Sequence, residues 1–345
     1  MIVFKRFLFL LLFTISFSNQ WVGINSEVPK APVMELISSD IQNTTIQFKL
    51  DGFFFNSVSI NQNEYKVVKF PKGASIMNLG HPDLPKMSSS IIIPDNRNML
   101  VEIISSNYVE YENIEIAPSK GNISRLINPE NISYDFSDIY NENSFYPQDI
   151  AILNEPYILR DYRGQVVQVN PIQYNPVTKV LRVYTNIDLS VSFNEEPALN
   201  PFNRNKTLKK IDNEYKNIYN SHFMNFDSES TRFEYLVDQG NMLIISDGNF
   251  MDEIQPLVDW KNKKGIPTEL VNVSSIGSSA SSIASFVANY YNSNDLTFLL
   301  LVGDIAQIPS TIVSGSASDM SYGCIPGNDF YPEVIVGRMS GSTPT

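Results

Sequence analysis

The 345-residue chain contains one cysteine, Cys324, and two histidines, His81 and His222. One cysteine cannot form an internal disulfide, so the fold must depend on an apolar core or on bound ions. A catalytic thiolate needs a neighbouring base, which is usually histidine. Because both histidines lie well before Cys324 in the chain, we expect Cys324 to be a packed thiol and not a nucleophile. His81 and His222 lack metal-ligand spacing and are predicted to be a turn residue and a linker residue.

Positive charge is also scarce, since 25 Lys and Arg face 37 Asp and Glu and the formal net charge is -12. Binding to nucleic acid needs concentrated Lys and Arg to neutralise phosphates, so the composition argues against a nucleic-acid partner. No G-x-G-x-x-G sequence follows the first predicted strand of the second half, and no GK[ST] loop occurs. These two absences argue against a nucleotide cofactor.

Long apolar runs are missing everywhere except at the N-terminus. There, Lys5 and Arg6 precede the apolar run Phe7–Phe13, and small residues follow. This pattern is typical of a signal peptide, with cleavage predicted between Ser18 and Asn19. The alternative is a membrane anchor, but the run falls short of the ~20 apolar residues that a span needs. We therefore expect an exported protein, secreted or at the cell surface, with no membrane span after signal removal.

Residues 19–200 show the alternation of apolar and polar residues that is typical of strands, as at Thr45–Leu50 and Ile187–Phe193. Turn residues such as Asn175 and Pro176 separate these segments. The spacing predicts a β-rich domain, either an antiparallel sandwich or a barrel. Residues 201–232 are rich in Asn, Lys and Asp and are predicted to be a linker.

In residues 233–345 the periodicity changes to alternating apolar strands and helical patterns. This order predicts βαβαβ connectivity, hence an α/β domain with a mainly parallel sheet covered by helices. In such sheets ligands bind beyond the carboxyl ends of the strands, which makes the loop after residue 302 the expected functional edge. The predicted strands are Met242–Ile245, Thr268–Val273, Phe298–Val302 and Val334–Gly337, and the predicted helices are Phe250–Lys264 and Ser281–Tyr291.

The loop between the last two predicted strands is rich in acids. Asp304 directly follows one strand, and Asp329, Tyr331 and Glu333 stand at alternate positions before the next. An extended backbone would point these alternate positions to one side. Two carboxylates with a third from Asp304 are hard oxygen ligands suited to calcium. The alternative is that the acids cap a turn and solvate an edge, and spacing alone leaves both interpretations open.

Several segments closely resemble the catalytic domain of the gingipains, a family of secreted bacterial cysteine peptidases (peptidase family C25). The resemblance covers LVDWKNKKGIPTE at residues 257–269 and DLTFLLLVGD at residues 295–304. It continues in the same order through Ser318-Asp319, Tyr322-Gly323 and Gly327-Asn328-Asp329 to Gly337-Arg338. The segments at residues 80–85 and 174–176 look like features of the family's propeptide.

The resemblance implies a caspase-like endopeptidase that acts on protein and peptide substrates through a Cys–His dyad, after basic residues in the best-known members. It implies the propeptide as an intramolecular inhibitor and calcium as a structural ion. By position, the side chains of Asp304, Asp329 and Glu333 match calcium carboxylates of the family. Pro326 and Tyr331 match residues that provide backbone oxygens.

The resemblance also implies maturation by cleavage between Arg232 and Phe233. The dyad His and Cys are expected beyond Thr345, so the catalytic domain is expected to be incomplete here and this chain alone inactive. Two alternatives remain: a sortase-like member of the family that processes surface cargo, and a non-enzymatic, calcium-stabilised surface protein.

Overall fold

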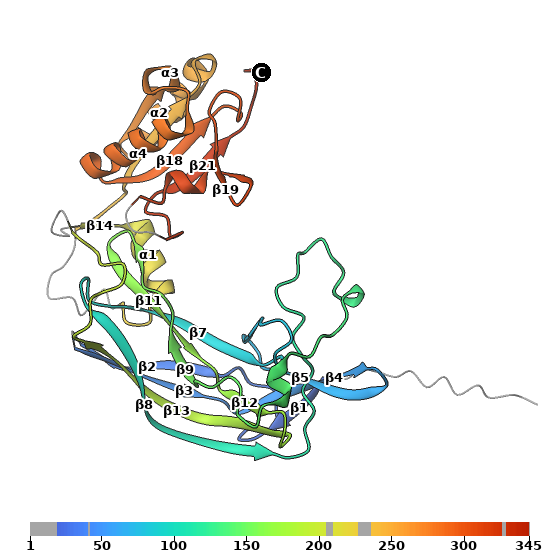
Figure 1. Cartoon of the computed structure of the whole chain (residues 1–345). Coiled ribbons are helices and arrows are strands. Elements are labelled where there is room, and N and C mark those ends of the chain that lie inside the picture. Colours follow the sequence, from blue (N-terminus) through green and yellow to red (C-terminus); the bar gives the residue numbers. More distant parts are fainter. Residues whose placement is uncertain (1–18, 41, 205–209, 227–235, 326–328, 345) are drawn as a thin grey trace, which may run out of the picture.

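The computed structural model describes residues 19–40, 42–204, 210–226, 236–325 and 329–344. Residues 1–18 of the predicted signal peptide, the Arg232–Phe233 junction and Pro326 lie outside the described residues. Figure 1 shows a broad β-rich region at the bottom and a smaller α/β region at the top, joined through α1 and β14. No helix among the described residues combines the length and the apolar character that crossing a membrane requires.

The β-rich region consists of antiparallel sheets, as the alternating pattern predicts. One sheet has the order β12-β13-β3-β2 with β8 also on β13, a second has the order β10-β11-β7-β6 with β9 on β11, and a third has the order β1-β4-β5. The strands are β1 (Gln20–Gly23), β2 (Val33–Ser39), β3 (Asn43–Lys49), β4 (Gly52–Ile60), β5 (Asn63–Lys69), β6 (Ala74–Ser75), β7 (Pro85–Ile92), β8 (Asn98–Tyr111), β9 (Ala151–Leu153), β10 (Tyr157–Leu159), β11 (Tyr162–Val169), β12 (Ile172–Asn175) and β13 (Val180–Asn194).

The core of this region lies between sheets. Phe48 of β3 and Leu189 of β13 belong to the same buried cluster as Ile91 of β7 and Val167 of β11, and all four are 0% exposed. Apolar residues at every second position of a strand point to one face, so two such faces close on each other as a sandwich. Short 3-10 turns at Pro129–Asn131 and Asp138–Asn141 interrupt the long connection between β8 and β9.

The predicted linker contains regular structure that packs against both regions. It holds β14 (Lys210–Asp212) and α1 (Asn213–His222), and β14 pairs in parallel with β15 (Leu236–Asp238). Asp212 caps the helix, because its Oδ1 accepts a hydrogen bond from the Tyr215 backbone nitrogen at 3.0 Å. Tyr215 and Tyr219 are almost fully buried. The helical spacing therefore produces a packed helix between the regions and not an exposed connection.

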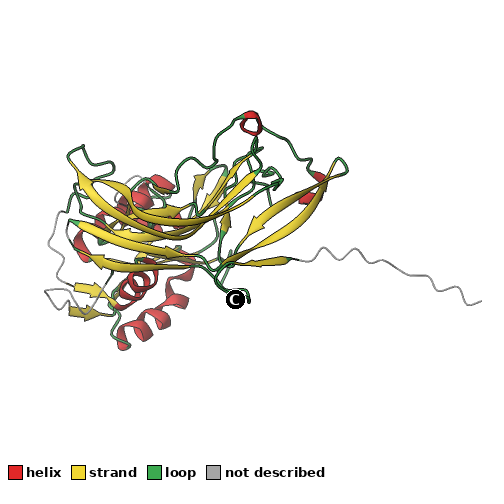
Figure 2. Cartoon of the chain, turned by 90° about the horizontal axis from the view of Figure 1, so that it is seen from below, coloured by secondary structure: helices red, strands yellow, loops and turns green. Residues whose placement is uncertain are grey.

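The α/β region has a parallel sheet in the order β17-β16-β18-β21. Alternate residues of β16 face two different clusters: Leu243 and Ile245 pack with α4, whereas Met242 and Ile244 pack with α2. The predicted parallel sheet with covering helices is therefore confirmed, and the helices lie on both of its faces. Figure 2 shows most of the helices of the chain on the left of the view. The elements are β16 (Asn241–Ser246), α2 (Met251–Lys263), β17 (Thr268–Asn272), α3 (Val273–Ile276), α4 (Ala280–Asn294), β18 (Leu296–Val302), β19 (Thr311–Val313), β20 (Ser316–Ser318) and β21 (Ile335–Met339), with 3-10 turns at Gly248–Phe250 and Met320–Tyr322.

Candidate functional site

The structure places the predicted calcium carboxylates at opposite edges of the parallel sheet. Phe298 of β18 pairs with Ile335 of β21, and Val302 pairs with Met339, so the two strands run the same way. Asp304 therefore lies beyond the carboxyl edge, whereas Glu333 lies before the amino edge, roughly 25 Å away at about 3.3 Å per residue. This corrects the expected grouping of Asp304 with Asp329 and Glu333. Among the described residues, no three His, Cys, Asp or Glu side chains form a metal-binding group.

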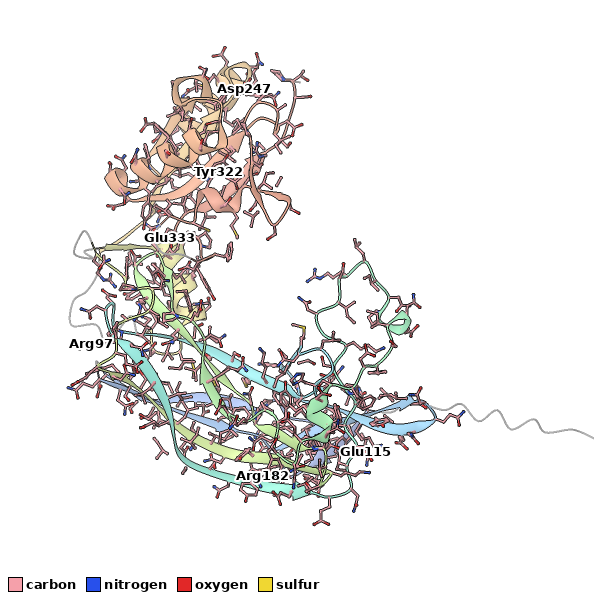
Figure 3. All side chains as sticks on the ribbon, viewed as in Figure 1. Arg97, Glu115, Arg182, Asp247, Tyr322 and Glu333 are labelled. Atoms are coloured by element: carbon pink, nitrogen blue, oxygen red, sulfur yellow. The ribbon has the colours of Figure 1, made fainter. Side chains whose placement is uncertain are left out.

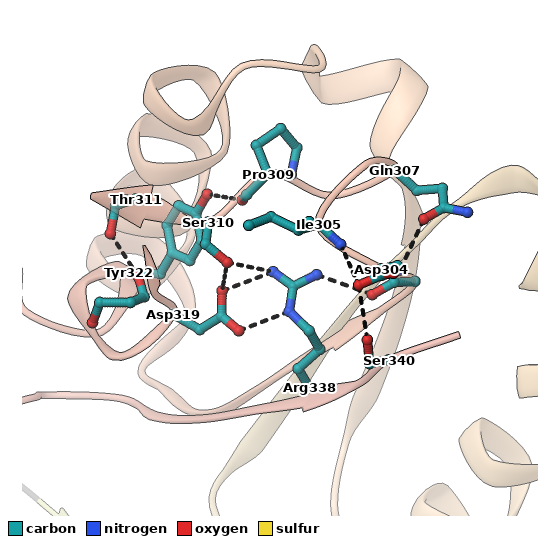
Figure 4. A network of polar contacts seen from close by, with 12 residues as sticks. Asp304, Ile305, Gln307, Pro309, Ser310, Thr311, Asp319, Tyr322, Arg338 and Ser340 are labelled. Atoms are coloured by element: carbon teal, nitrogen blue, oxygen red, sulfur yellow. Dashed lines mark hydrogen bonds and ion pairs between the residues drawn. The ribbon is translucent and has the colours of Figure 1, made fainter. Parts of the chain in front are cut away.

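At the carboxyl edge, Asp304 is half-buried and belongs to a hydrogen-bonded network (Figure 4). Its Oδ1 accepts hydrogen bonds from the Ile305 backbone nitrogen at 2.8 Å and from the Ser340 hydroxyl at 3.0 Å. These bonds lower the pKa of its carboxyl. The neighbouring Arg338 guanidinium donates two bonds of 2.7 Å to Asp319 and one of 2.9 Å to the Gly303 carbonyl. This network ties the end of β21 to the loop that follows β18.

At the amino edge, Asp329 and Glu333 contact the β-rich region. The hairpin of β10 and β11 points the backbone nitrogen of Ile158 at Asp329 Oδ2, at 2.7 Å. Two residues later, the Arg160 nitrogen donates to Glu333 Oε1 at 3.3 Å. Glu333 is 0% exposed, and burial raises the pKa of its carboxyl to about 8. Figure 3 shows Glu333 where the two regions meet.

The side chain of Arg160 joins three elements in the same place. Its Nη1 lies 3.1 Å from Asp212 Oδ2 and 3.4 Å from the Thr297 hydroxyl, and its guanidinium lies 4.4 Å from the centre of the Tyr215 ring. Thr297 also donates to Asp212 Oδ2 at 2.9 Å. Asp212 is 3% exposed and Thr297 is 0% exposed. The β-rich region, the start of α1 and β18 therefore share one buried ionic network.

Sequence reasoning did not find this network. Asp212 carried a usable signal, because an Asp before a helical pattern is typical of an N-cap. Nothing in the sequence indicated that Arg160 lies beside Asp212 or that Thr297 points away from the apolar core.

Aromatic side chains surround the polar contacts. The rings of Tyr157 and Tyr331 stack with centroids 3.8 Å apart, and the Tyr157 hydroxyl lies 2.6 Å from Nε2 of His222. The Tyr215 hydroxyl donates to the Pro332 carbonyl at 3.0 Å. The side chain of Tyr331 therefore packs against the hairpin. The expected role of its backbone oxygen as a calcium ligand is not tested by these contacts.

Cys324 and His81 have the surroundings of structural residues. Burial, together with the carboxylates of Glu333 and Asp329, raises the pKa of the Cys324 thiol to about 11, which disfavours the thiolate. His81 stands in a turn, where its backbone nitrogen donates to the Asn78 carbonyl at 3.2 Å. These surroundings are those of a packed thiol and a turn residue.

The burial of His222 predicts that the contact between the hairpin and α1 depends on pH. Burial lowers the pKa of His222 below its ordinary value of 6.5, so the fold favours the neutral ring. The stabilisation is therefore complete above pH 6.5 and is lost as the pH falls from there through the pKa in the folded state. We expect the urea midpoint to fall more steeply between pH 7 and pH 5 in the parent chain than in His222→Phe. Equal slopes for the two proteins would contradict this.

Comparisons with known proteins agree with the division into two regions. The family model Propeptide_C25 matches residues 25–233, and the model Peptidase family C25 matches residues 235–345. Gingipain R2 of Porphyromonas gingivalis strain W83 is 41% identical over 323 residues, which are 91% of this chain and 43% of that protein. Lys-gingipain HG66 of P. gingivalis is 24% identical over 320 residues, which are 85% of this chain and 18% of that protein. This chain therefore spans less than half the length of these relatives.

A solved structure of similar fold is that of a complex of Porphyromonas gingivalis RgpB pro- and mature domains. The two chains are 41% identical in sequence and superpose with a TM-score of 0.52. The superposition covers 56% of this chain and 96% of the chain in the solved structure. Both family models, the alignment with gingipain R2 and this solved structure indicate the same family. The chain belongs to the gingipain family, peptidase family C25, and carries the family's propeptide followed by part of its peptidase domain.

Proposed function

We propose that this chain is part of the precursor of a cysteine endopeptidase that cleaves peptide bonds after arginine and is kept latent by its propeptide. The observation that carries this proposal is the continuous alignment with gingipain R2, at 41% identity across both regions. The lower identity to Lys-gingipain, 24%, favours arginine over lysine. Alignment through the peptidase domain also favours a peptidase over a sortase-like processing enzyme or a non-enzymatic surface protein.

The resemblance implies a mechanism in which a thiolate attacks the scissile carbonyl, backbone amides bind the oxyanion, and a histidine protonates the leaving amine. We propose that this dyad lies in a part of the protein that corresponds to the remainder of the relatives. The described residues contribute the platform, because Arg338 and Asp319 fasten the loops at the carboxyl edge of the sheet. Cys324 has no part in this proposed mechanism, since its thiolate is disfavoured.

Hydrolysis of matched peptides with Arg, Lys or Ala before the scissile bond tests the function in the protein extended through the rest of the peptidase domain. We expect fastest turnover after Arg, loss of activity with a thiol reagent, and unchanged turnover in Cys324→Ala. Turnover that resists the thiol reagent, or that Cys324→Ala abolishes while the fold stays intact, would refute the proposal.

We propose that maturation separates the two regions between Arg232 and Phe233. The matches to the propeptide and peptidase models end and begin at residues 233 and 235, which supports a junction there. We expect Phe233 as the new N-terminus by N-terminal sequencing, and no such product from Arg232→Ala. Arg204→Ala, which removes an arginine from the preceding segment, is the matched control and should be processed normally. A mature N-terminus at another position contradicts the prediction.

We further propose export of the protein, with signal cleavage between Ser18 and Asn19, and calcium binding by Asp329 and Glu333 in the mature form. The oxygen chemistry of these two side chains suits calcium. Their surroundings in the precursor do not, because four backbone nitrogens and the side-chain nitrogen of Asn200 already donate to them. Asp304 lies at the other edge of the sheet, and Pro326 lies outside the described residues. The calcium proposal therefore concerns a form in which the propeptide has moved away.

A further inference from the structure

The turn between β10 and β11 carries two opposite charges into the junction of the β-rich and α/β regions. Arg160 and Asp161 form this turn, since Leu159 pairs with Tyr162. Arg160 adopts a φ of +48°, a region in which Gly, Asn and Asp are the usual residues. The side chains of Arg160 and Asp161 are nevertheless only 9% and 17% exposed. An unusual residue in this backbone conformation, with its cation buried, indicates that the turn is shaped for its contacts in the junction.

Two carboxylates lie beside the same guanidinium, and they are not equally well compensated. Arg160 Nη1 lies 3.1 Å from Asp212 Oδ2, whereas Arg160 Nε lies 3.7 Å from Asp161 Oδ2. Asp212 Oδ2 also accepts a hydrogen bond of 2.9 Å from the Thr297 hydroxyl. Asp161 Oδ2 accepts a hydrogen bond of 2.7 Å from the Tyr219 hydroxyl. Asp161 is therefore the carboxylate whose negative charge has the weaker ion pair.

The other groups around Asp161 leave this excess of negative charge in place. Burial raises the pKa of the Asp161 carboxyl, although Arg160 and Tyr219 oppose the rise. Arg204 acts on Asp161 as well, but it pairs with Asp95, whose Oδ1 lies 3.0 Å from Arg204 Nη2. The titratable and charged groups that face Asp161 come from its own turn, from α1 and its N-cap, from the segment before β14 and from α4, and they are Arg160, Tyr219, Asp212, Arg204 and Tyr291.

Tyr291 connects Asp161 to the α/β region. Burial raises the pKa of the Tyr291 hydroxyl, and the carboxylate of Asp161 adds to the rise while Arg160 opposes it. Tyr291 belongs to α4, so docking of the propeptide brings an uncharged ring against the turn. Docking therefore helps to remove Asp161 from water without supplying a second cation.

We propose that docking of the propeptide on the α/β region takes up one proton at Asp161, so that the junction is tightest in mild acid and loosens as the pH rises. The proton comes from water and leaves the ion pair of Arg160 with Asp212 intact. This inference rests on the latency proposed above and gives it a dependence on pH.

The direction follows from the raised pKa of Asp161 in the docked state. The stabilisation is complete below the ordinary pKa of an aspartate, about 3.9, and is lost as the pH rises through the pKa in the docked state. A single proton changes the docking constant by at most about tenfold for each pH unit.

Amide hydrogen exchange of the full chain measures docking without any enzymatic assay. Ile158 and Arg160 donate their N–H groups to carboxylates of the α/β region, so their protection factors report the opening of the junction. A protection factor is taken relative to the unprotected rate at each pH, which removes the pH dependence of the exchange reaction itself. The measurement runs from about pH 4, near the ordinary pKa of aspartate, to about pH 8.

Asp161→Asn is the informative variant, because it keeps an oxygen acceptor for Tyr219 and cannot carry the charge. We expect the ratio of the protection factors, parent chain over Asp161→Asn, to fall as the pH rises, by up to about tenfold per unit. Glu333 and His222 titrate in both proteins, so their contributions cancel in this ratio. Asp138→Asn is the matched control, because it removes an exposed aspartate of the β-rich region, and its ratio to the parent chain should not change with pH.

A second measurement needs no variant. The pH titration of the Asp161 carboxyl carbon in the parent chain, followed by nuclear magnetic resonance, should have a midpoint above the ordinary value of about 3.9. A midpoint at or below that value overturns the inference, whatever the stability of Asp161→Asn.

The contrary outcomes separate this inference from the proposed latency. A ratio for Asp161→Asn that stays constant or rises with pH overturns the proton uptake and leaves the docked propeptide in place. The same pH dependence at amides of the β-rich core, such as Val167 and Leu189, assigns the proton to folding of the propeptide and overturns the inference. Unprotected Ile158 and Arg160 amides at every pH contradict the junction itself, and with it the latency.

Discussion

Replacing Arg163 with alanine is expected to lower the free energy of unfolding of the propeptide by about 4 kcal/mol. Hydrogen bonds to charged groups contribute about 1.5–3 kcal/mol each, and the desolvation of the buried guanidinium offsets part of their sum. Arg163 lies on β11 and is 0% exposed. Its guanidinium donates to the carbonyls of Pro94, Arg97, Leu199 and Asn200 at 2.6–3.0 Å. The change would leave these carbonyls without their donor and release two loops from the sheet. Urea unfolding followed by circular dichroism measures the loss.

Arg163→Lys separates charge from geometry. Lysine keeps the positive charge, but its compact ammonium cannot reproduce the planar fork that reaches four carbonyls. We expect its stability to fall between those of the parent chain and Arg163→Ala. A loss below about 1 kcal/mol for Arg163→Ala, the usual size for a single net hydrogen bond, would contradict the role assigned to this side chain.

Arg160→Met is expected to cost about 3–5 kcal/mol, the usual penalty for removing one partner of a buried ion pair. Asp212 is 3% exposed and would keep a buried charge without its cation at 3.1 Å. The loss should be measured by urea unfolding and accompanied by faster amide exchange in β18, where Thr297 joins the network. The backbone N–H of residue 160 is retained, so the bond to Glu333 is not removed by this change.

Two further variants test the cause. Arg160→Met combined with Asp212→Asn removes the cation and its carboxylate partner at 3.1 Å, while Asp161, whose Oδ2 lies 3.7 Å from Arg160 Nε, keeps its carboxyl. The double variant should recover part of the stability lost in the single variant. Lys30→Ala breaks an exposed ion pair with Asp51 and should cost less than about 1 kcal/mol. If Asp212→Asn destabilises the Arg160→Met variant as much as it destabilises the parent chain, the two changes are independent. The buried pair then does not explain the stability lost in Arg160→Met.

Local patterns in the sequence predicted most of the elements. The alternation at Thr45–Leu50 became β3, and the helical spacing before Gly265 became α2, which ends where Gly265 adopts a φ of +84°. The predicted strand Thr268–Val273 ends one residue earlier, because Asn272 caps α3 with its side chain. Such features depend on residues a few positions apart, and their physical causes are present in the sequence itself.

The position of Asp304 illustrates what local patterns leave open. The sequence places Asp304 after one strand and Glu333 before another, and a connection that returned antiparallel would have put both at one edge. The connection instead crosses back over the sheet, so β21 starts at the opposite edge. The direction of a strand depends on where its long connection packs, which involves residues far apart in the chain.

For this protein, the sequence by itself determined the β-rich and α/β regions, the family to which both belong, and the character of Cys324 as a thiol without a nearby base. Only the tertiary structure decided that the acids of one loop divide between two edges of a sheet. It also decided that Asp329 and Glu333 accept hydrogen bonds from β10 and from the turn that follows β10. The physical reason is that periodicity and composition act over neighbouring residues. The contacts of Ile158 with Asp329, 171 positions apart, exist only because two separately formed regions pack together.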